Sequence, residues 1–281
     1  MSSAVDLEAP PRETGPDAEP RRRGDWLRAL VRGVGQTLIT FGLVALLFVV
    51  YELYVTDILA AQEQDQLSQQ IQEQWADLPP ADAPTVTPPE GAPAPGPAPA
   101  PAPAPAPESI DAGLGDPFAV LHIPRLGEDY ERVVVEGTAQ VQLAQGPGHY
   151  LDTAMPGQDG NFAVAGHRIG RGSPFLDLDR MQPGDAIVVE TASNWYVYRV
   201  LGDPATGDFG TDPSGVPGRQ IVHPSQIDVI APTPGGGDPS GAYLTLTTCH
   251  PKYSAAQRLV IHARLDGSPS ARPRPPTGHP P

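Results

Sequence analysis

From Ala92 to Pro107, proline occupies every second position, with alanine or a single glycine between the prolines. Proline has no backbone N–H and a fixed φ, so this run cannot join a regular hydrogen-bond ladder and favours an extended polyproline II helix. At ~3.1 Å per residue the run would hold its two flanks about 50 Å apart. We therefore predict a Pro/Ala-rich linker over residues 78–113 that acts as a spacer, with a docking site for a partner as the alternative. The folded part is then smaller than the chain of 281 residues, which contains 37 Pro and 30 Gly.

The chain beyond this linker has the pattern of short strands separated by turns. The predicted strands are Ala119–Ile123, Arg132–Glu136, Asn161–Ala165, Ala186–Thr191, Trp195–Val200, Ile227–Ala231, Ala242–Cys249 and Arg258–Leu265. Eight strands with little helix indicate a closed or nearly closed barrel, and about 150 residues are enough for one hydrophobic core. We predict a mainly β fold, an eight-stranded barrel with short helices over residues 114–268, and a Pro-rich disordered tail over residues 269–281.

An uncharged apolar stretch from Gly33 to Tyr51 is long enough to span a bilayer, whose core needs ~20 residues. Arginines precede it at positions 21, 22, 23, 28 and 32, and acidic residues follow it at positions 52 and 57. By the positive-inside rule, the N-terminus is then cytoplasmic and everything after Tyr51 is extracytoplasmic. We predict a disordered, basic cytoplasmic segment over residues 1–32 and a transmembrane helix over residues 33–54, in a single-pass protein of the cell membrane. A cleaved signal peptide is the alternative, although bulky rather than small residues follow the apolar stretch.

A helix is also predicted between the apolar stretch and the linker. Residues 55–77 contain neither Gly nor Pro, and Leu67, Ile71 and Trp75 recur at i, i+4 spacing. We expect a helical stalk there, with a partner-binding helix as the alternative.

Charge and cysteine content exclude several functions. The formal charge is −15 and Lys252 is the only lysine, which argues against nucleic acid as a partner, because phosphate binding needs clustered cations. The single cysteine, Cys249, excludes an intramolecular disulfide and a Cys-based zinc site, and leaves a buried structural thiol or a reactive one. No His-Glu-x-x-His motif or calcium-loop spacing occurs, so we expect no metal and no cofactor. Four acidic side chains could still gather around calcium, although solvated loop positions are the favoured interpretation: Asp152, Asp159, Asp228 and Asp238.

Two neighbouring predicted strands place Cys249 and Arg258 on one face. Alternation puts Cys249 with Thr245 and Thr247, opposite the leucines, and puts Arg258 on the same face as His262. If the strands form a hairpin, Cys249 and Arg258 face each other, and a guanidinium beside a thiol favours the thiolate and can hold an oxyanion. The alternative is a small buried cysteine beside a solvated arginine, and these two strands alone do not decide between the interpretations.

A nucleophilic thiol also needs a base, because at an ordinary pKa only about 3% of it is ionised at pH 7. His250 follows Cys249 directly and would point the other way along a strand. His262 shares the face of Arg258 but lies about 13 Å farther along. His167 ends an apolar strand, where a side chain can project over a barrel mouth. Spacing alone does not show that this mouth is the one that holds Cys249.

Several motifs resemble the signature of the sortase family. The main ones are Thr245-Leu246-Thr247-Thr248-Cys249, Arg258 nine residues later, and Ala165-Gly166-His167-Arg168 with Pro174-Phe175 beyond. Supporting ones are Ile123-Pro124-Arg125-Leu126, Gly146-Pro147-Gly148-His149-Tyr150, and Pro156-Gly157 followed by Gly160-Asn161. The order His, Cys, Arg is that of the family, and the resemblance covers about Leu114 to Gly267. The run Cys249-His250-Pro251, followed by Ser254-Ala255 and Arg258-Leu259, is most similar to class E sortases of high-GC Gram-positive bacteria.

The resemblance implies a membrane-anchored cysteine transpeptidase with Cys249 as nucleophile, His167 as acid/base and Arg258 as the group that stabilises the oxyanion. Such an enzyme cleaves a sorting signal between Thr and Gly, here with Leu-Ala-x-Thr-Gly preferred, and passes the thioacyl product to an amine of a lipid-linked cell-wall precursor. The implied partners are surface proteins with C-terminal signals of this type. The expected substrate-binding residues, of which the apolar ones are equally explained as core, are Tyr150, Val229, Ile230, Pro232, Thr247 and Thr248. The Tyr150 hydroxyl would accept a hydrogen bond from the backbone N–H that Ala has and Pro lacks.

Two other functions stay open from the sequence. A peptidoglycan peptidase or L,D-transpeptidase is also a cysteine enzyme of the wall, but its cysteine motif differs, and such peptidases place Cys before His. A membrane-tethered, non-enzymatic β-domain could bind wall or surface proteins, using the Pro-rich segment. Alkylation of Cys249 separates these functions, because an enzyme loses peptide cleavage whereas a binding domain keeps its partner.

Overall fold

The computed structural model describes residues 23–51, 56–76, 108–210, 212–238, 240–267 and 269–271. The chain divides into two compact units, residues 1–50 and 51–281. Most of the predicted cytoplasmic segment (residues 1–22), the end of the predicted transmembrane helix (52–54), the two ends of the predicted stalk (55 and 77), most of the predicted linker (78–107) and the end of the predicted tail (272–281) lie outside the described residues.

Helix α1 (Arg23–Val50) belongs to the first unit. Its Trp26–Val50 part is long and apolar enough to cross a membrane, with a mean hydropathy of 2.1. The hydroxyls of Thr37 and Thr40 donate to carbonyl oxygens one turn back, so these polar groups are satisfied within the helix. A helix of this length and composition is compatible with a single-pass membrane anchor.

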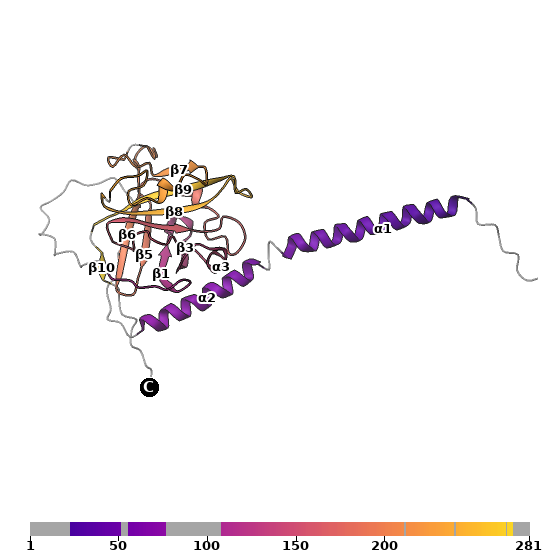
Figure 1. Ribbon diagram of the computed structural model, residues 1–281, viewed down its shortest axis with the longest axis horizontal. Coiled ribbons are helices and arrows are strands. Elements are labelled where there is room, and N and C mark those ends of the chain that lie inside the picture. The colour runs from indigo at the N-terminus through magenta and orange to yellow at the C-terminus, as the bar shows by residue number, and fades with distance from the viewer. Residues whose placement is uncertain are drawn as a thin grey trace, which may run out of the picture. The chain divides into compact units, whose positions relative to one another are not determined.

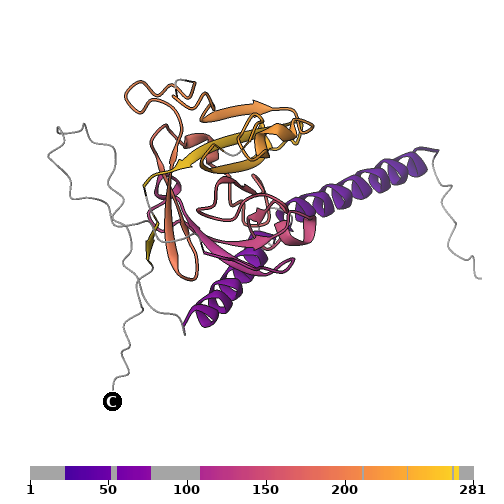
Figure 2. The same cartoon turned by 60° about the vertical axis from the view of Figure 1, so that its left-hand side comes forward.

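The second unit is a β-barrel with few helices (Figures 1 and 2). Its strands are β1 (Pro117–His122), β2 (Glu131–Glu136), β3 (Gly148–His149), β4 (Gly160–Ala165), β5 (Ala186–Glu190), β6 (Asn194–Val200), β7 (Arg219–Val222), β8 (Ala242–His250), β9 (Gln257–Leu265) and β10 (Ser270–Ala271). Neighbouring strands follow the order β6-β5-β1-β2-β3-β4-β8-β9, and β9 pairs back onto β6, which closes a ring of these eight strands. Outside the ring, β7 pairs with the first half of β9, and β10 pairs with β6. The predicted eight-stranded, mainly β barrel is confirmed.

Seven of the predicted strands coincide with β1, β2, β4, β5, β6, β8 and β9 to within two residues. The eighth prediction, Ile227–Ala231, is wrong, because Ile227–Ile230 form the 3-10 helix η4. Ile227 is 74% exposed and only Val229 of this helix is buried, so the segment has no alternating face to lay on the sheet. The strand beside β9 is instead Arg219–Val222.

The two faces of the β8/β9 hairpin meet different surroundings. Leu244 and Leu246, which alternation places on one face, belong to the barrel core. Full burial of one such side chain contributes roughly 1.5–3 kcal/mol to stability. On the opposite face, Val260 of β9 packs against Val229 of η4. The outer face of the hairpin is therefore covered in part by the segment that contains η4.

Helix α2 (Thr56–Trp75) lies along the outside of the barrel, against β1 and β2 (Figure 1). The side chains that recur at i, i+4 spacing, Leu67, Ile71 and Trp75, are buried against valines of these two strands. The Gln64 amide acts as a neighbouring strand would, because its Oε1 accepts from the Val133 N–H at 2.9 Å and its Nε2 donates to the Val133 carbonyl at 3.3 Å. This helix is thus part of the packed domain.

Short helices occupy several of the connections between strands. They are η2 (Pro124–Leu126), α3 (Gln140–Leu143), η3 (Leu178–Arg180) and η4. Two of them, η3 and η4, border the site described next.

Candidate active site

The β8/β9 hairpin places Cys249 directly opposite Arg258, as alternation along the two strands predicts. Both residues lie where residues 251–256 connect the strands. Cys249 is partly exposed. The thiol can therefore meet a ligand from solvent while its strand position is fixed by the hairpin ladder.

The parallel pairing of β4 with β8 brings His167 to the same place. Ala165 pairs with Thr247, so His167, two residues beyond Ala165, falls level with Cys249, two residues beyond Thr247. Two further hydrogen bonds extend this pairing: the Gly166 N–H donates to the Thr247 carbonyl at 3.0 Å, and the Thr248 hydroxyl donates to the Gly166 carbonyl at 2.8 Å. His167 and Cys249 line one cavity of about 300 Å³.

A glycine is required just before this histidine. A Cβ at Gly166 would lie 2.5 Å from the ring of Phe175, which is fully buried. The Phe175 N–H in turn donates to the His167 carbonyl at 3.1 Å. The Ala-Gly-His-Arg motif and the downstream Pro-Phe motif are therefore one packing unit that fixes the backbone of His167.

The His167 imidazole has a pKa below its usual value, first because burial disfavours the charged form and second because Arg171 repels it. Its Nε2 is buried and has no hydrogen-bond partner among the described residues. Neutral pH therefore favours the uncharged ring, which can take up a proton. An unpartnered buried nitrogen costs free energy unless a ligand satisfies it.

Arg258 borders a second cavity, of about 180 Å³, which Cys249 does not line. Its Nη1 donates to the carbonyls of Ala255 and Gln257 at 2.9 and 3.0 Å, which hold the guanidinium at the hairpin end. Four of the predicted substrate-binding residues line this same cavity: Tyr150, Thr247, Val229 and Ile230. Its lining is completed by residues of β7, β9, the loop before η4 and η4 itself, namely Val222, Val260, His223, Pro224, Gln226 and Ile227.

Thr248 and Pro232, also predicted to bind substrate, do not line this cavity. The Thr248 hydroxyl is buried and donates to the Gly166 carbonyl, and Pro232 is exposed beyond η4. Within the cavity, the Tyr150 and Thr247 hydroxyls are 3.0 Å apart, so they share one hydrogen bond.

A buried His–Glu pair holds the backbone beside Tyr150. His149 Nδ1 lies 2.8 Å from Glu136 Oε2, and its Nε2 lies 2.8 Å from the Thr153 hydroxyl, which donates to the Tyr150 carbonyl at 2.8 Å. Both ring nitrogens of His149 thus have a hydrogen-bond partner, one a carboxylate and the other a hydroxyl. The sequence motif that contains His149 and Tyr150 is therefore a positioning unit for the Tyr150 side chain.

The rest of the first cavity is lined by residues to which the sequence assigned no role in the site: Arg168, Ile169, Tyr253, Ser254 and Ala255. Tyr253 is 83% exposed, and the hairpin loop that carries it has no periodic signal. The position of Arg168 directly after His167 could have indicated that it lies near the site, but nothing in the sequence indicates that its side chain is buried.

A family model described as the sortase domain matches residues 121–266, a range that includes Cys249, His167 and Arg258. The chain belongs to the sortase family. Members of this family are transpeptidases.

Two curated relatives of this sortase come from Streptomyces coelicolor. Sortase SrtE1 is 32% identical over 243 residues, which cover 83% of this chain and 56% of that protein. Sortase SrtE2 is 31% identical over 252 residues, which cover 87% of this chain and 85% of that protein. The chain thus spans little more than half the length of SrtE1. The predicted similarity to class E is confirmed.

Solved sortase structures agree with the barrel. The SrtF sortase from Corynebacterium diphtheriae is 39% identical with a TM-score of 0.53, over 62% of this chain and 94% of that chain. The SrtA sortase from Actinomyces oris is 33% identical with a TM-score of 0.50, over 62% of this chain and 91% of that chain.

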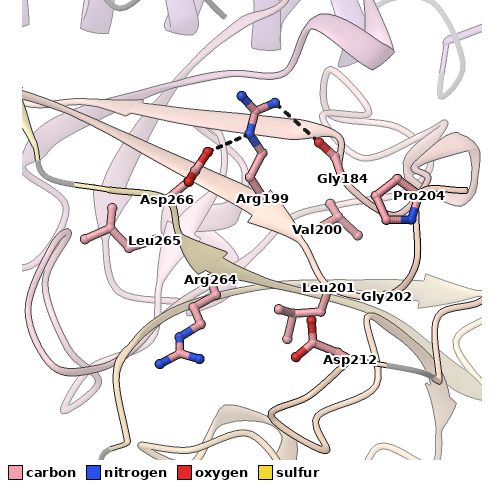
Figure 3. Close-up of a pocket in the computed structure, with 10 residues that line it drawn as sticks. All are labelled: Gly184, Arg199, Val200, Leu201, Gly202, Pro204, Asp212, Arg264, Leu265 and Asp266. Atoms are coloured by element: carbon pink, nitrogen blue, oxygen red, sulfur yellow. Dashed lines mark hydrogen bonds and ion pairs between the residues drawn. The ribbon is translucent and has the colours of Figure 1, made fainter. Parts of the chain in front are cut away.

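A third cavity of this sortase, of about 430 Å³, is lined by residues at the ends of β6 and β9 (Figure 3). Arg264, one of its lining residues, pairs with Tyr243 at the start of β8, the opposite end of that strand from the thiol. The Arg199 guanidinium there already donates to Asp266 at 3.0 Å and to the Gly184 carbonyl at 3.3 Å. The cavities beside Cys249, which combine a thiol, an imidazole and a guanidinium, are therefore the candidate active site.

Proposed function

We propose that this chain is a membrane-anchored sortase that cleaves a sorting signal between Thr and Gly and transfers the acyl part to a cell-wall amine through a thioacyl-enzyme. The observation that carries the proposal is the arrangement around the only thiol of the chain. Cys249 faces Arg258 across the hairpin and shares a cavity with His167. Nucleophile, proton carrier and cation are the three parts that thiol-based acyl transfer needs.

In the first half-reaction, the Cys249 sulfur attacks the Thr carbonyl and its proton passes to neutral His167. The lowered pKa of His167 supports this role, because the ring begins uncharged. Arg258 stabilises the negative charge that forms on the carbonyl oxygen. The His167 imidazolium then donates the same proton to the departing Gly amine, which leaves a thioester on Cys249.

In the second half-reaction, an amine of a lipid-linked peptidoglycan precursor attacks this thioester. His167 removes the amine proton and returns it to the Cys249 sulfur as the thioester breaks. The net change exchanges one peptide bond for another, so neither a redox partner nor a metal is needed.

The cavity that Arg258 borders supports a site for the sorting signal. It combines apolar walls from Val229 and Ile230 with the paired hydroxyls of Tyr150 and Thr247. A signal with Ala at its second position has a backbone N–H there, which the Tyr150 hydroxyl can accept, whereas Pro has none. We therefore assign a preference for Leu-Ala-x-Thr-Gly, carried by surface proteins.

Helix α1 and the arginines before its apolar part support an anchor with a cytoplasmic N-terminus and an extracytoplasmic barrel. This orientation brings the thiol to the side of the membrane where surface proteins meet the wall.

The test uses the full chain in detergent, incubated with a Leu-Ala-x-Thr-Gly peptide and a short amine and followed by mass spectrometry. We expect a thioester adduct on Cys249 and a ligated product, both absent in Cys249→Ala. Peptide binding that survives alkylation of Cys249, with no cleavage in the unmodified chain, would instead support the non-enzymatic binding domain.

A further inference from the structure

A chain of buried hydrogen bonds lies between the barrel strands and the short helix η4. Three of its members, Asn161 of β4, Thr245 of β8 and His262 of β9, are each at most 1% exposed. Burial of a polar side chain is costly unless its polar groups are hydrogen-bonded. None of the three lines either cavity beside Cys249, so the proposed acyl transfer does not account for them.

The side-chain amide of Asn161 faces η4. Its Nδ2 lies 3.3 Å from the Val229 carbonyl oxygen and 3.0 Å from the Ala231 carbonyl oxygen. A carbonyl oxygen can only accept a hydrogen bond, so the amide nitrogen must lie on this side and donate both of its protons. The amide oxygen then faces the Thr245 hydroxyl, which donates to it at 2.8 Å. These partners fix the orientation of the amide.

The rest of the chain of hydrogen bonds follows from this orientation. The Thr245 hydroxyl gives its single proton to Asn161, so its oxygen accepts from His262 Nδ1 at 2.9 Å. The other ring nitrogen of His262 lies 3.1 Å from the amide nitrogen of Gln220, which can only donate. The ring is therefore neutral, with its proton on Nδ1. Burial, which lowers the pKa of His262 to about 3, favours the same neutral form.

This chain of hydrogen bonds secures both ends of the segment that contains η4. Gln220 lies in β7, just before residues 223–231, and Asn161 binds the backbone at the other end of that segment. Val229 is the only buried residue of η4, so apolar packing alone holds little of this helix. The segment supplies more than half of the residues that line the cavity assigned to the sorting signal: His223, Pro224, Gln226, Ile227, Val229 and Ile230.

We infer that Asn161 is a positioning residue that holds η4 on the barrel and thereby fixes one wall of the cavity assigned to the sorting signal. The inference rests on the proposed function for the role of that cavity. Asn161 does not line the cavity, so it acts on the peptide through the backbone of Val229 and Ala231 and not by contact.

The first measurement needs no substrate. Hydrogen–deuterium exchange of the full chain in detergent is followed over residues 223–235, where the N–H groups of Ala231 and Gly235 donate to the Asp228 carbonyl at 3.1 and 2.9 Å. In Asn161→Ala, we expect this segment to exchange roughly ten-fold faster, because two hydrogen bonds to its backbone are lost. The ladder between β8 and β9 should keep its wild-type exchange rate, since the change is local.

The second measurement is the turnover of a Leu-Ala-x-Thr-Gly peptide. In Asn161→Ala, we expect KM to rise roughly five-fold and kcat to stay within about two-fold of the wild type. The reason is that the amide of Asn161 bonds to Val229, Ala231 and Thr245 and not to a reacting group. A loss of binding without a loss of turnover is what a displaced cavity wall produces.

Asn194→Ala is the matched control. Asn194 is also a buried asparagine, but it lies at the start of β6, which pairs with β5, β9 and β10. We expect this variant to keep the wild-type KM and the wild-type exchange over residues 223–235. A folded Asn161→Ala chain with unchanged exchange in this segment overturns the inference, as does an equal increase in Asn194→Ala.

If Asn161→Ala does not fold, two variants of Thr245 decide. Thr245→Val removes the hydroxyl that holds the Asn161 oxygen, whereas Thr245→Ser keeps a hydroxyl there. Faster exchange of residues 223–235 in Thr245→Val that Thr245→Ser restores supports the inference, and equal exchange in the two variants refutes it. Faster exchange with an unchanged KM supports the positioning role and refutes the assignment of the sorting signal to this cavity, so the two failures are distinguishable.

Discussion

Replacing Tyr150 by Phe removes one hydroxyl from the cavity assigned to the sorting signal. That hydroxyl is 3.0 Å from the Thr247 hydroxyl, so one of the two can donate while the Tyr150 oxygen keeps a lone pair for a peptide N–H. Only a signal with Ala at the second position offers that N–H. One hydrogen bond contributes about 1 kcal/mol, so the wild type should prefer Leu-Ala-x-Thr-Gly over Leu-Pro-x-Thr-Gly roughly five-fold in kcat/KM.

In Tyr150→Phe this ratio should fall to about one, because the lost hydroxyl affects the Ala peptide alone. Loss of the contact with Thr247 acts on both peptides and cancels in the ratio. The measurement is kcat/KM for two peptides that differ only at the second position, in wild type and variant.

Tyr243→Phe is the matched control. Its hydroxyl is also paired with a hydroxyl, that of Ser240 at 3.1 Å, but it lies at the start of β8, away from Cys249. We expect this variant to keep the wild-type ratio. A wild-type preference for Pro, or a ratio that Tyr150→Phe leaves unchanged, would refute the role of Tyr150 while leaving the acyl-transfer chemistry untouched.

Three further predictions follow from the site and the fold. Arg258→Lys should lower kcat by a factor on the order of 10²–10³, because a point charge replaces a planar guanidinium at the oxyanion. Arg264→Lys, at an exposed position on the same strand, should leave kcat unchanged. Near-normal turnover of a peptide substrate by Arg258→Lys would remove the oxyanion role. Burial lowers the pKa of His262 to about 3, so on acidification the unfolded chain binds a proton at this residue before the folded chain does. The contribution of His262 to the free energy of unfolding should be complete above pH ~6.5 and fall by ~1.4 kcal/mol per pH unit as the pH drops toward 3. Urea titrations at several pH values should find this slope in the wild type and not in His262→Gln. A protease added to intact cells should digest the chain after Tyr51 and spare a tag at Met1; protection of the barrel would contradict the orientation.

Local patterns in the sequence predict the strands and one half of the site. Period-two alternation places Cys249 and Arg258 on one face, and neighbouring strands joined by a short loop then form a hairpin with little ambiguity. The position of His167 could not be derived in this way, because β4 and β8 are parallel and their pairing joins segments far apart in the sequence. The prediction that His167 lies beside the thiol came only from the similarity of the motifs to those of the sortase family.

The misassigned strand and the buried arginine have a common physical origin. In Ile227–Ile230, the apolar residues predict burial, yet only Val229 is buried, on the outer face of the hairpin. Arg168 is of a residue type that is usually exposed, yet its side chain is buried. The five N–H donors of its rigid guanidinium match the carbonyl groups and the carboxylate that the tertiary structure brings around it. Both outcomes depend on what the folded chain brings near, which composition and periodicity do not encode.

The contact of α2 with β2 means that the folding unit is not a continuous piece of the sequence. Gln64 occupies the backbone N–H and C=O of Val133, and three apolar side chains of the helix cover the valines beside it. A fragment that starts after the Pro/Ala run would display that strand edge to other chains, together with an uncovered apolar strip, which is the surface that promotes edge-to-edge aggregation. Helix α2, which precedes the Pro/Ala run, therefore covers this edge of the barrel and opposes its pairing with a second chain.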